Sequence, residues 1–314
     1  MKRPDATQLA LITALIVLLL LGSVLPKWLF LLTLSLGKGL VVLGLMLLLR
    51  TGLVSFGQGL FYCLGAYAVG SLGQFFGIKD VLLSLLTGVA IGSLIALLLG
   101  FLMAKYRDIF FAMLSLAFSM ILYGLLVRTA ALGSTDGFNV PPPTLFGRPI
   151  GGEAHQYALF ALACVIAFVA ALLMHTYFDT PLGKLSPAIR DNEIRVEYMG
   201  ASVRQAIHVK YVIAGALAGL GGALTAMTVG HIDPDLAYWT TSGEFIFVAI
   251  LSGTGSVIAP FLGSVVFEVI RTYAYQYSPN TWQLVVGGAL LLVIIFLPSG
   301  LWSVFGYLRR RGSA

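Results

Sequence analysis

The sequence predicts an all-α fold: a polytopic bundle of about 8 to 10 transmembrane helices. Of its 314 residues, 59% are hydrophobic and only 10% are charged, and the mean hydropathy is +0.95. That much apolar surface cannot be buried inside one water-soluble core. The apolar runs are about 17 to 25 residues long, which is the length that a helix needs to cross a bilayer. These observations exclude an ordinary soluble protein.

Most of the predicted spans are uninterrupted apolar runs. We expect helices at Leu9 to Leu25, Trp28 to Leu49, Leu53 to Phe76, Val81 to Met103, Ile109 to Val127, Gln156 to Met174, Val209 to Gly230 and Trp282 to Ser303. The first run could instead be a cleaved signal peptide, but no convincing small-residue cleavage site follows it.

One further apolar region, from about Leu236 to Ile270, is broken by glycines near residues 252–256. Such a break predicts either a re-entrant turn or a tight hairpin between two helices. Non-helical backbone is tolerated at membrane depth only where it is buried in protein or lines a wet cavity. Discontinuous helices of this kind are common at transport sites.

The distribution of basic residues predicts the orientation of the chain. With a cytoplasmic N-terminus, the inner side receives Lys2, Arg3, Arg50, Lys105, Arg107, Lys184, Arg190, Arg195, Arg204, Lys210 and Arg309 to Arg311. The outer side then receives only Lys27, Lys79, Arg128, Arg148 and Arg271. This bias indicates that both termini are cytoplasmic, so the number of crossings is even.

The one sizeable polar interruption, residues 175–208, is predicted to be a cytoplasmic loop that contains a short helix. Ser186 is a suitable N-cap, Pro187 suits the first helical position, and Gly200 can end the helix, which gives a helix from Pro187 to Met199. Its apolar residues Ile189, Val196 and Met199 fall near one face. Such a stripe can dock into a groove of a partner protein, and the alternative is a helix that lies on the inner lipid headgroups. Asp191 and Arg195 are expected to form an i,i+4 pair.

Four blocks of the chain resemble one family in the same order. They are Gly52–Tyr67, Arg107–Phe118, Ser186–Gly200, which continues through Lys210 to Leu224, and Gly253–Gly263. All four are similar to segments of the branched-chain amino acid ABC transporter permeases of the LivM type, and they are spread over most of the chain.

The resemblance implies that residues 1–314 form one permease domain of an ATP-driven importer in the bacterial cytoplasmic membrane. Its partners would be a second permease subunit of the related LivH type, two cytoplasmic ATPase subunits and an extracytoplasmic substrate-binding protein. ATP and Mg²⁺ would be bound by the ATPases, since this chain has no G-x-x-x-x-G-K-[ST] motif and is not expected to be an enzyme. No metal site or nucleic-acid partner is expected. The helix that couples the permease to the ATPase would comprise Ala188, Ile189, Arg190, Asp191, Asn192, Glu193, Val196, Glu197, Met199 and Gly200.

The substrate path is predicted from polar and glycine residues within the spans: Lys38, Ser55, Gln58, Tyr62, Ser115, Gly253, Thr254 and Gly255. Gln58 stands where the family usually has histidine. Lys38 lies in the middle of a span, where an ammonium is costly. It can face substrate, pair with an acidic residue or reach water along a kinked helix. Glu244 and Glu268 are similar cases.

These departures leave the substrate open. Branched-chain amino acids are the leading class, and urea, short amides and other small carboxylates are the alternatives. A proton-coupled secondary transporter would need acidic or histidine relays deep in several spans, and the sequence has almost none. An intramembrane hydrolase would need a base beside a serine such as Ser55, but no histidine lies in the interior of a predicted span.

Overall fold

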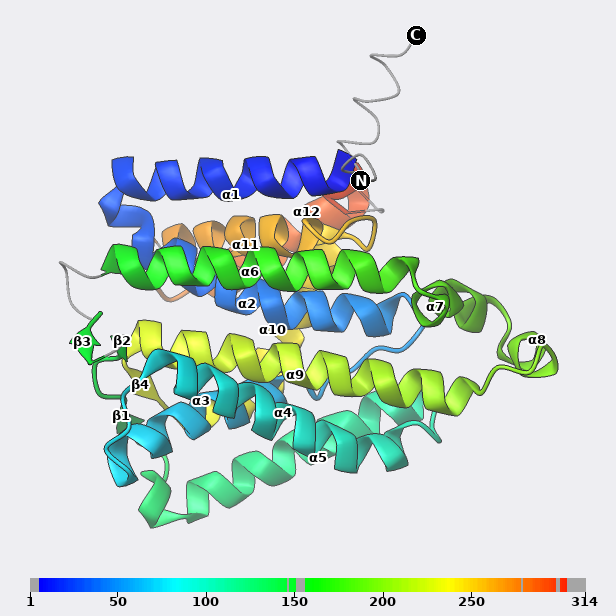
Figure 1. Cartoon of the computed structure of the whole chain (residues 1–314), viewed down its shortest axis with the longest axis horizontal. Coiled ribbons are helices and arrows are strands. Elements are labelled where there is room, and N and C mark those ends of the chain that lie inside the picture. The colour runs from blue at the N-terminus through cyan, green and yellow to red at the C-terminus, as the bar shows by residue number, and fades with distance from the viewer. Residues whose placement is uncertain (1–5, 146, 151–155, 278, 298–299, 304–314) are drawn as a thin grey trace, which may run out of the picture.

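The computed structural model describes residues 6–145, 147–150, 156–277, 279–297 and 300–303, and it shows an all-α bundle, as predicted (Figure 1). The helices are α1 (Ala6–Val24), η1 (Pro26–Trp28), α2 (Leu29–Leu49), α3 (Gln58–Phe75), α4 (Val81–Met103), α5 (Asp108–Arg128), η2 (Ala130–Leu132), α6 (Gln156–Asp179), α7 (Pro181–Asp191), α8 (Glu193–Tyr198), α9 (Val203–Val229), η3 (Pro234–Ala237), α10 (Trp239–Ser252), α11 (Ala259–Tyr277) and α12 (Trp282–Phe296). The strands are β1 (Phe138–Asn139), β2 (Thr144–Leu145), β3 (Arg148–Pro149) and β4 (His231–Ile232).

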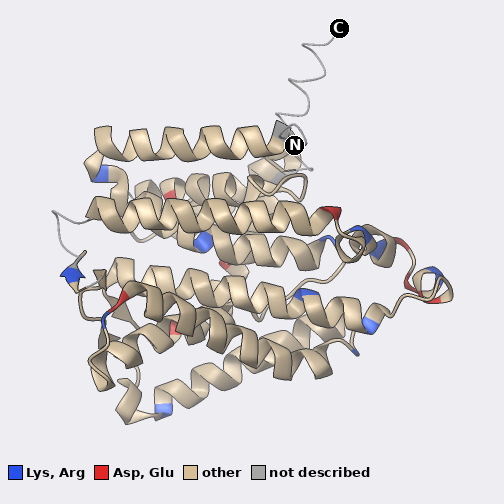
Figure 2. Cartoon of the chain, in the orientation of Figure 1, with Lys and Arg blue, Asp and Glu red and all other residues tan. Residues whose placement is uncertain are grey.

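Six helices of the described residues are long and apolar enough to cross a membrane: α1, α2 with η1, α4, α5, α6 and α9. The bundle has two ends. α7, α8 and the start of α1 lie at the end that we call inner, on the right of Figure 1, and β1 to β4 lie at the outer end. Figure 2 shows that most charged residues of the described chain gather at these two ends. Lys2, Arg3 and Arg309 to Arg311, which contributed to the predicted orientation, lie outside the described residues.

The centre of the bundle is built around α2 and α9. In the most apolar 18-residue stretch of α2, 89% of the residues are buried, against 11% in the corresponding stretch of the peripheral α1. Small residues let the backbones of neighbouring helices touch: a Cβ at Gly65 of α3 would overlap the carbonyl oxygen of Gly219 of α9. Close contact of this kind holds membrane helices together where no hydrophobic force does. The glycines of α9 are thus packing residues.

Two spans are shorter than the sequence predicts because their first parts are not helical. The prediction that a helix begins at Leu53 is wrong: residues 53–57 are irregular, and α3 begins at Gln58. α10 begins only at Trp239, after η3. Ser119, midway along α5, donates a hydrogen bond to the carbonyl oxygen of Ala237 (2.7 Å), so the η3 segment reaches membrane depth.

The glycine-rich break is a hairpin between α10 and α11, one of the two predicted alternatives. Gly253 caps α10 with a φ of 79°, a left-handed conformation that suits glycine. α10 and α11 pack against each other and against α2. The break lies at the inner end, because the carbonyl oxygen of Thr254 accepts hydrogen bonds from Arg50, which follows α2.

The polar segment differs from the prediction in three ways. It contains two helices instead of one from Pro187 to Met199: α7 begins after its N-cap Thr180, and Asn192, with a φ of −162°, ends it and caps α8. Ser186 is not an N-cap but a fully buried residue inside α7. The break at Asn192 also separates Asp191 from Arg195, so they do not form the expected helical pair. Gly200 follows α8 with a φ of 87°, which agrees with its predicted role as terminator.

Candidate functional site

We call α3 with the irregular residues 53–57, and α10 with η3, the two interrupted spans. They meet inside the bundle. The backbone N–H of Gly59, at the start of α3, donates to Ser242 Oγ of α10 (2.9 Å). The Phe56 N–H in the irregular segment donates to Ser115 Oγ of α5 (3.0 Å), and the Gly57 N–H donates to Ser55 Oγ (3.3 Å). Serine side chains thus satisfy backbone groups that a continuous helix would have satisfied itself. The predicted path residues Ser55 and Ser115 are brought together here.

Gln58 occupies the first position of α3 at this meeting point. Its side chain is fully buried, and neither its amide oxygen nor its amide nitrogen has a hydrogen-bond partner in the described structure. A buried amide without partners costs about 1 to 3 kcal/mol. Tyr62, one turn later, packs edge-on against Phe245 of α10 (ring centroids 5.1 Å apart). Gln58 therefore places an amide without hydrogen-bond partners in the described structure beside α10.

The charge on Lys38 is matched by acidic residues of α10 and α11. Lys38 Nζ lies 2.5 Å from Glu268 Oε1 and 3.6 Å from Glu244 Oε2. Arg271 Nη1 lies 3.0 Å from Glu244 Oε2 and 3.8 Å from Glu268 Oε1. We call these four residues the charge network. Of the three roles predicted for Lys38, the geometry shows the ion pair with an acidic residue.

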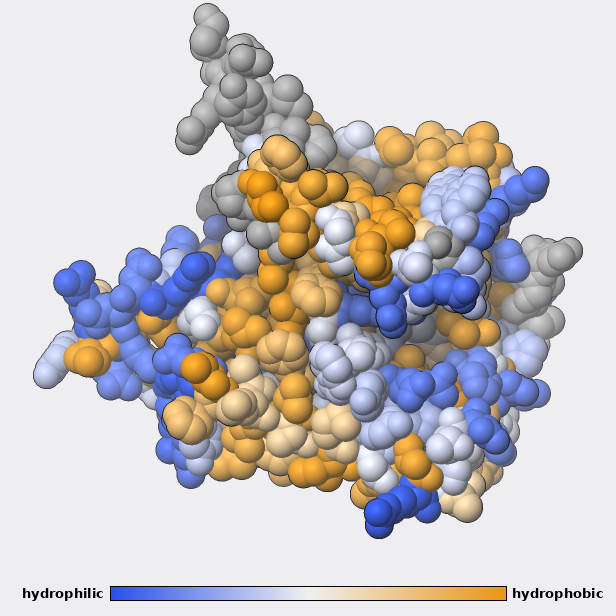
Figure 3. Space-filling model, turned by 180° about the vertical axis from the view of Figure 1, so that it is seen from behind, coloured by the Kyte–Doolittle hydropathy of each residue, from blue (hydrophilic) through white to orange (hydrophobic). Residues whose placement is uncertain are grey.

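The two halves of the charge network differ in exposure. The side chains of Lys38 and Glu268 are 10% and 5% exposed, whereas those of Arg271 and Glu244 are 35% and 23% exposed. α10, α11 and α12 lie behind α2 in Figure 1, and Figure 3 shows that side of the molecule, where hydrophilic residues gather around a hollow between apolar surfaces. Charged groups within a span almost always face the protein interior or water. This face therefore borders water or another protein, not lipid chains.

The predicted path residues Gly253, Thr254 and Gly255 are not part of the charge network. Thr254 lies ten residues beyond Glu244, about 15 Å at the rise of a helix. Its carbonyl oxygen accepts hydrogen bonds from Arg50 Nε (2.9 Å) and Nη2 (2.5 Å). The Arg50 guanidinium also lies 3.9 Å from the centre of the Phe178 ring, at the end of α6. Arg50 thus ties together α2, α6 and the α10–α11 break.

The surroundings of Arg50 include the polar segment. A hollow of about 540 Å³ is lined by Arg50, Thr254 and Phe178 together with Lys184, Pro187 and Arg190 of α7. Burial lowers the pKa of Arg50 below its usual value, although a guanidinium remains charged at any physiological pH. Arg50 thus lies between this hollow, which α7 borders, and the α10–α11 break.

We expect Arg50→Ala to weaken the connection between α2, α6 and the α10–α11 break. The variant loses two charge-assisted hydrogen bonds, each about 1.5 to 3 kcal/mol, and the stack on Phe178. The variant should therefore unfold at a lower temperature in detergent, because its free energy of unfolding should fall by at least about 1.5 kcal/mol. Arg204→Ala is the control, because among the described residues Arg204 donates only one long, exposed hydrogen bond, of 3.4 Å, to the carbonyl oxygen of Phe101. Equal unfolding temperatures of the two variants would contradict this role.

The apolar residues of the polar segment face in two directions. Ile189 and Val196 are 5% and 3% exposed and pack into the bundle, so the prediction that they form an exposed docking stripe is wrong. Ile194, Tyr198 and Met199 are instead 66%, 88% and 81% exposed at the inner end. We call these three residues the exposed tip.

A salt bridge joins the start of α8 to the rest of the bundle. Arg107 Nε lies 2.6 Å from Glu193 Oε1, which connects the α4–α5 turn to the polar segment. Both residues were in sequence blocks that pointed to the family, but nothing in the sequence indicated that they meet. Ser119, Ser242 and Arg50 were likewise not identified as site residues, and only the position of Arg50 at the end of a span hinted at a role.

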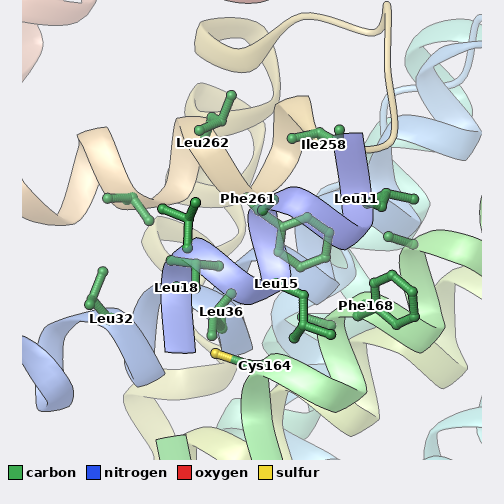
Figure 4. A pocket seen from close by; sticks show the side chains of 15 residues that line it. Leu11, Leu15, Leu18, Leu32, Leu36, Cys164, Phe168, Ile258, Phe261 and Leu262 are labelled. Carbon is green, nitrogen blue, oxygen red and sulfur yellow. The ribbon is translucent and has the colours of Figure 1, made fainter. Parts of the chain in front are cut away.

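A separate cavity of about 240 Å³ lies between α1, α2, α6 and α11 (Figure 4). Its lining is entirely apolar, with side chains such as Leu15, Leu36, Phe168 and Phe261 pointing into it. Such a cavity suits a hydrocarbon chain and offers no hydrogen bond to a polar solute. It is therefore not a candidate for the transport path.

Comparison with known proteins identifies a family. Residues 27–295 match the family described as the permease component of branched-chain amino acid transport systems. The match covers most of the chain and includes both interrupted spans, the charge network and the polar segment. No solved structure matches the chain.

Three curated relatives carry related descriptions. The chain is 28% identical over 293 residues to the high-affinity branched-chain amino acid transport system permease protein LivM of Escherichia coli K12; the match covers 85% of this chain and 66% of LivM. It is 24% identical to the corresponding BraD protein of Pseudomonas aeruginosa, over 80% of this chain and 86% of BraD. It is also 25% identical to LivH of Salmonella typhimurium, over 54% of this chain and 56% of LivH.

Proposed function

The chain belongs to the family of permease components of branched-chain amino acid transport systems, and from this premise we propose that it is one of two membrane subunits of an ATP-driven importer. Family membership makes the chain a multi-pass transport subunit and not an enzyme, and it confirms the resemblance found in the sequence. The proposed substrate class is branched-chain amino acids or a related small polar solute. Urea, short amides and small carboxylates remain the alternative class.

The observation that carries the proposal is the exposed tip at the inner end of an otherwise membrane-embedded bundle. Ile194, Tyr198 and Met199 expose apolar surface on a segment that its own buried residues, Ile189 and Val196, anchor to the bundle. Apolar side chains on a short helix are suited to a groove in a partner protein. We assign that groove to a cytoplasmic ATPase subunit.

Two contacts provide a route from the exposed tip into the membrane. The Arg107–Glu193 pair holds the start of α8 against the α4–α5 turn. Arg50 lines the hollow beside α7 and donates hydrogen bonds to the carbonyl oxygen of Thr254 in the α10–α11 break. ATP and Mg²⁺ are bound by the ATPase subunits in this proposal. ATP binding changes the groove, and the permease shifts between inward-open and outward-open states because the two states contact the ATPase differently.

We infer the remaining partners from the family match. The partial similarity to both LivM and LivH supports a pair of related permease subunits. The face that carries Glu244 and Arg271 is where we place the second permease or the water-filled path between the two. An extracytoplasmic binding protein delivers substrate to the outer end. The chain lies in the bacterial inner membrane with both termini cytoplasmic.

Tyr198→Asp tests this function. A carboxylate at the centre of the exposed tip should be excluded from an apolar groove, so ATPase subunits should no longer co-purify with the tagged chain and ATP-dependent uptake should be lost. Tyr198→Phe keeps the ring and should retain both. The readout is mass spectrometry of the gently purified complex, together with uptake in proteoliposomes.

The same purification separates the proposal from its rival. An ATPase pair and a second permease with the wild-type chain support the importer. A chain that purifies alone and moves solute in vesicles without ATP is a secondary transporter, and the proposal then fails.

A further inference from the structure

The charge network contains one buried pair and one accessible pair. The side chains of Lys38 on α2 and Glu268 on α11 are almost fully buried, whereas those of Arg271 and Glu244 are 35% and 23% exposed and can be reached from outside the bundle. The network holds two positive and two negative side chains, so its formal charge is zero. A solute that enters the network must preserve this balance, because an uncompensated charge within a membrane protein is costly.

We infer that the accessible pair is the binding site for the head group of a zwitterionic solute, which inserts between Arg271 and Glu244. The ammonium group of the solute takes the place of Arg271 at the Glu244 carboxylate, and its carboxylate group takes the place of Glu244 at the Arg271 guanidinium. One ion pair is replaced by two, and the total charge stays zero. The inference rests on the proposed function and names the substrate class and the residues that select it.

Solutes with other charges fit this site less well. A neutral amide would separate Arg271 from Glu244 without replacing the lost ion pair. An anion would satisfy Arg271 but would leave Glu244 with only the more distant Lys38 Nζ, at 3.6 Å. Bidentate binding of a carboxylate is a particular strength of arginine. The site therefore favours solutes that carry both charges.

The surroundings offer contacts for the rest of the solute. Phe247, one turn after Glu244 on α10, is 49% exposed, and the Trp282 ring centre lies 5.5 Å from the Arg271 guanidinium. Both can pack against an aliphatic side chain. On the other side of α10 lies the meeting point with α3, where the buried amide of Gln58 has no partner.

The first test needs no variant. The wild-type importer is purified without its binding protein, and labelled L-leucine bound to it is displaced by analogues. L-valine should displace leucine, whereas leucinamide, which keeps only the ammonium, 4-methylpentanoate, which keeps only the carboxylate, and urea should each do so at least about tenfold more weakly, because each loses a charge-assisted contact. Equal displacement by the zwitterion and its singly charged analogues would overturn the inference.

Two variants assign the charges to residues. Glu244→Gln should weaken leucine binding about tenfold or more while 4-methylpentanoate binds as well as before or better; Arg271→Gln should show the opposite pattern with leucinamide. Glu244→Asp should restore the preference for leucine, and Thr240→Ala, one turn earlier on α10, should leave it unchanged. If both Gln variants bind all the analogues as the wild type does, the site lies elsewhere.

The outcomes also separate this inference from the proposed function. A complex that contains its ATPases and takes up solute, yet does not prefer zwitterions, retains the proposed function and loses the inference. A chain that never associates with ATPases loses the proposed function, and displacement of leucine from the chain alone then still decides the inference.

Discussion

Gly222→Val is expected to abolish folding of the bundle. A Cβ at Gly222 of α9 would overlap the carbonyl oxygen of Tyr62 of α3 and would lie 3.1 Å from the backbone nitrogen of Ala66. These are backbone atoms of a helix, so no side-chain rotation can make room, and α3 and α9 must separate. The variant should give no monodisperse protein in detergent by size-exclusion chromatography.

Gly124→Val is the matched control. Gly124 lies within α5, and an added Cβ there would meet no atom within 4 Å. Both substitutions replace glycine with valine within a helix, so they change helix propensity and hydrophobicity by the same amount. Any difference in stability between the two variants therefore measures the close contact at Gly222. A Gly222→Val protein that elutes and melts as Gly124→Val does would show that α3 and α9 are not in backbone contact.

Glu268→Ala is expected to have the second large effect, on stability. Among the described residues, it leaves the ammonium of Lys38, whose side chain is 10% exposed, with only the contact to Glu244 at 3.6 Å. Removing one member of a buried ion pair costs about 3 to 5 kcal/mol. The variant should therefore unfold at a distinctly lower temperature in detergent.

The double variant Lys38→Met with Glu268→Gln distinguishes a broken pair from a general loss of packing. It removes both buried charges and leaves the Arg271–Glu244 pair balanced, so it should recover most of the lost stability. The Arg107–Glu193 pair, with side chains 28% and 31% exposed, provides the comparison, and its removal should cost about 0 to 1 kcal/mol. If Lys38→Met and Glu268→Ala each melt at the wild-type temperature, the buried pair does not hold α2 and α11 together.

Most of the helices could be predicted from the sequence because the length of an apolar run is a local signal. α4 was predicted with both of its ends. The irregular segment before α3 was missed because residues 53–57 are as apolar as a helix would be. A tertiary contact stabilises their irregular conformation: the Phe56 N–H donates a hydrogen bond to Ser115 Oγ of α5.

In the polar segment, the sequence did not predict where the helix begins or which way its apolar residues face. Ser186–Pro187 and Thr180–Pro181 are equally good starts for a helix, and the structure uses the second. An apolar stripe does not reveal whether it faces a partner or its own protein, and Ile189 and Val196 turned out to face the bundle. The partners of Lys38 could be proposed only as unspecified acidic residues, because Glu268 is 230 residues away in the chain.

The balance of charges around Lys38 has an electrical consequence. Each elementary charge that crosses a membrane potential of 100 mV gains or loses about 2.3 kcal/mol. The two cations and two anions of α2, α10 and α11 move no net charge if they shift together, and a zwitterion bound among them adds none. Each transport step at this site would therefore be electrically silent. The membrane voltage would then neither drive nor oppose accumulation of the solute. The free energy for accumulation would have to come from a source outside the bilayer.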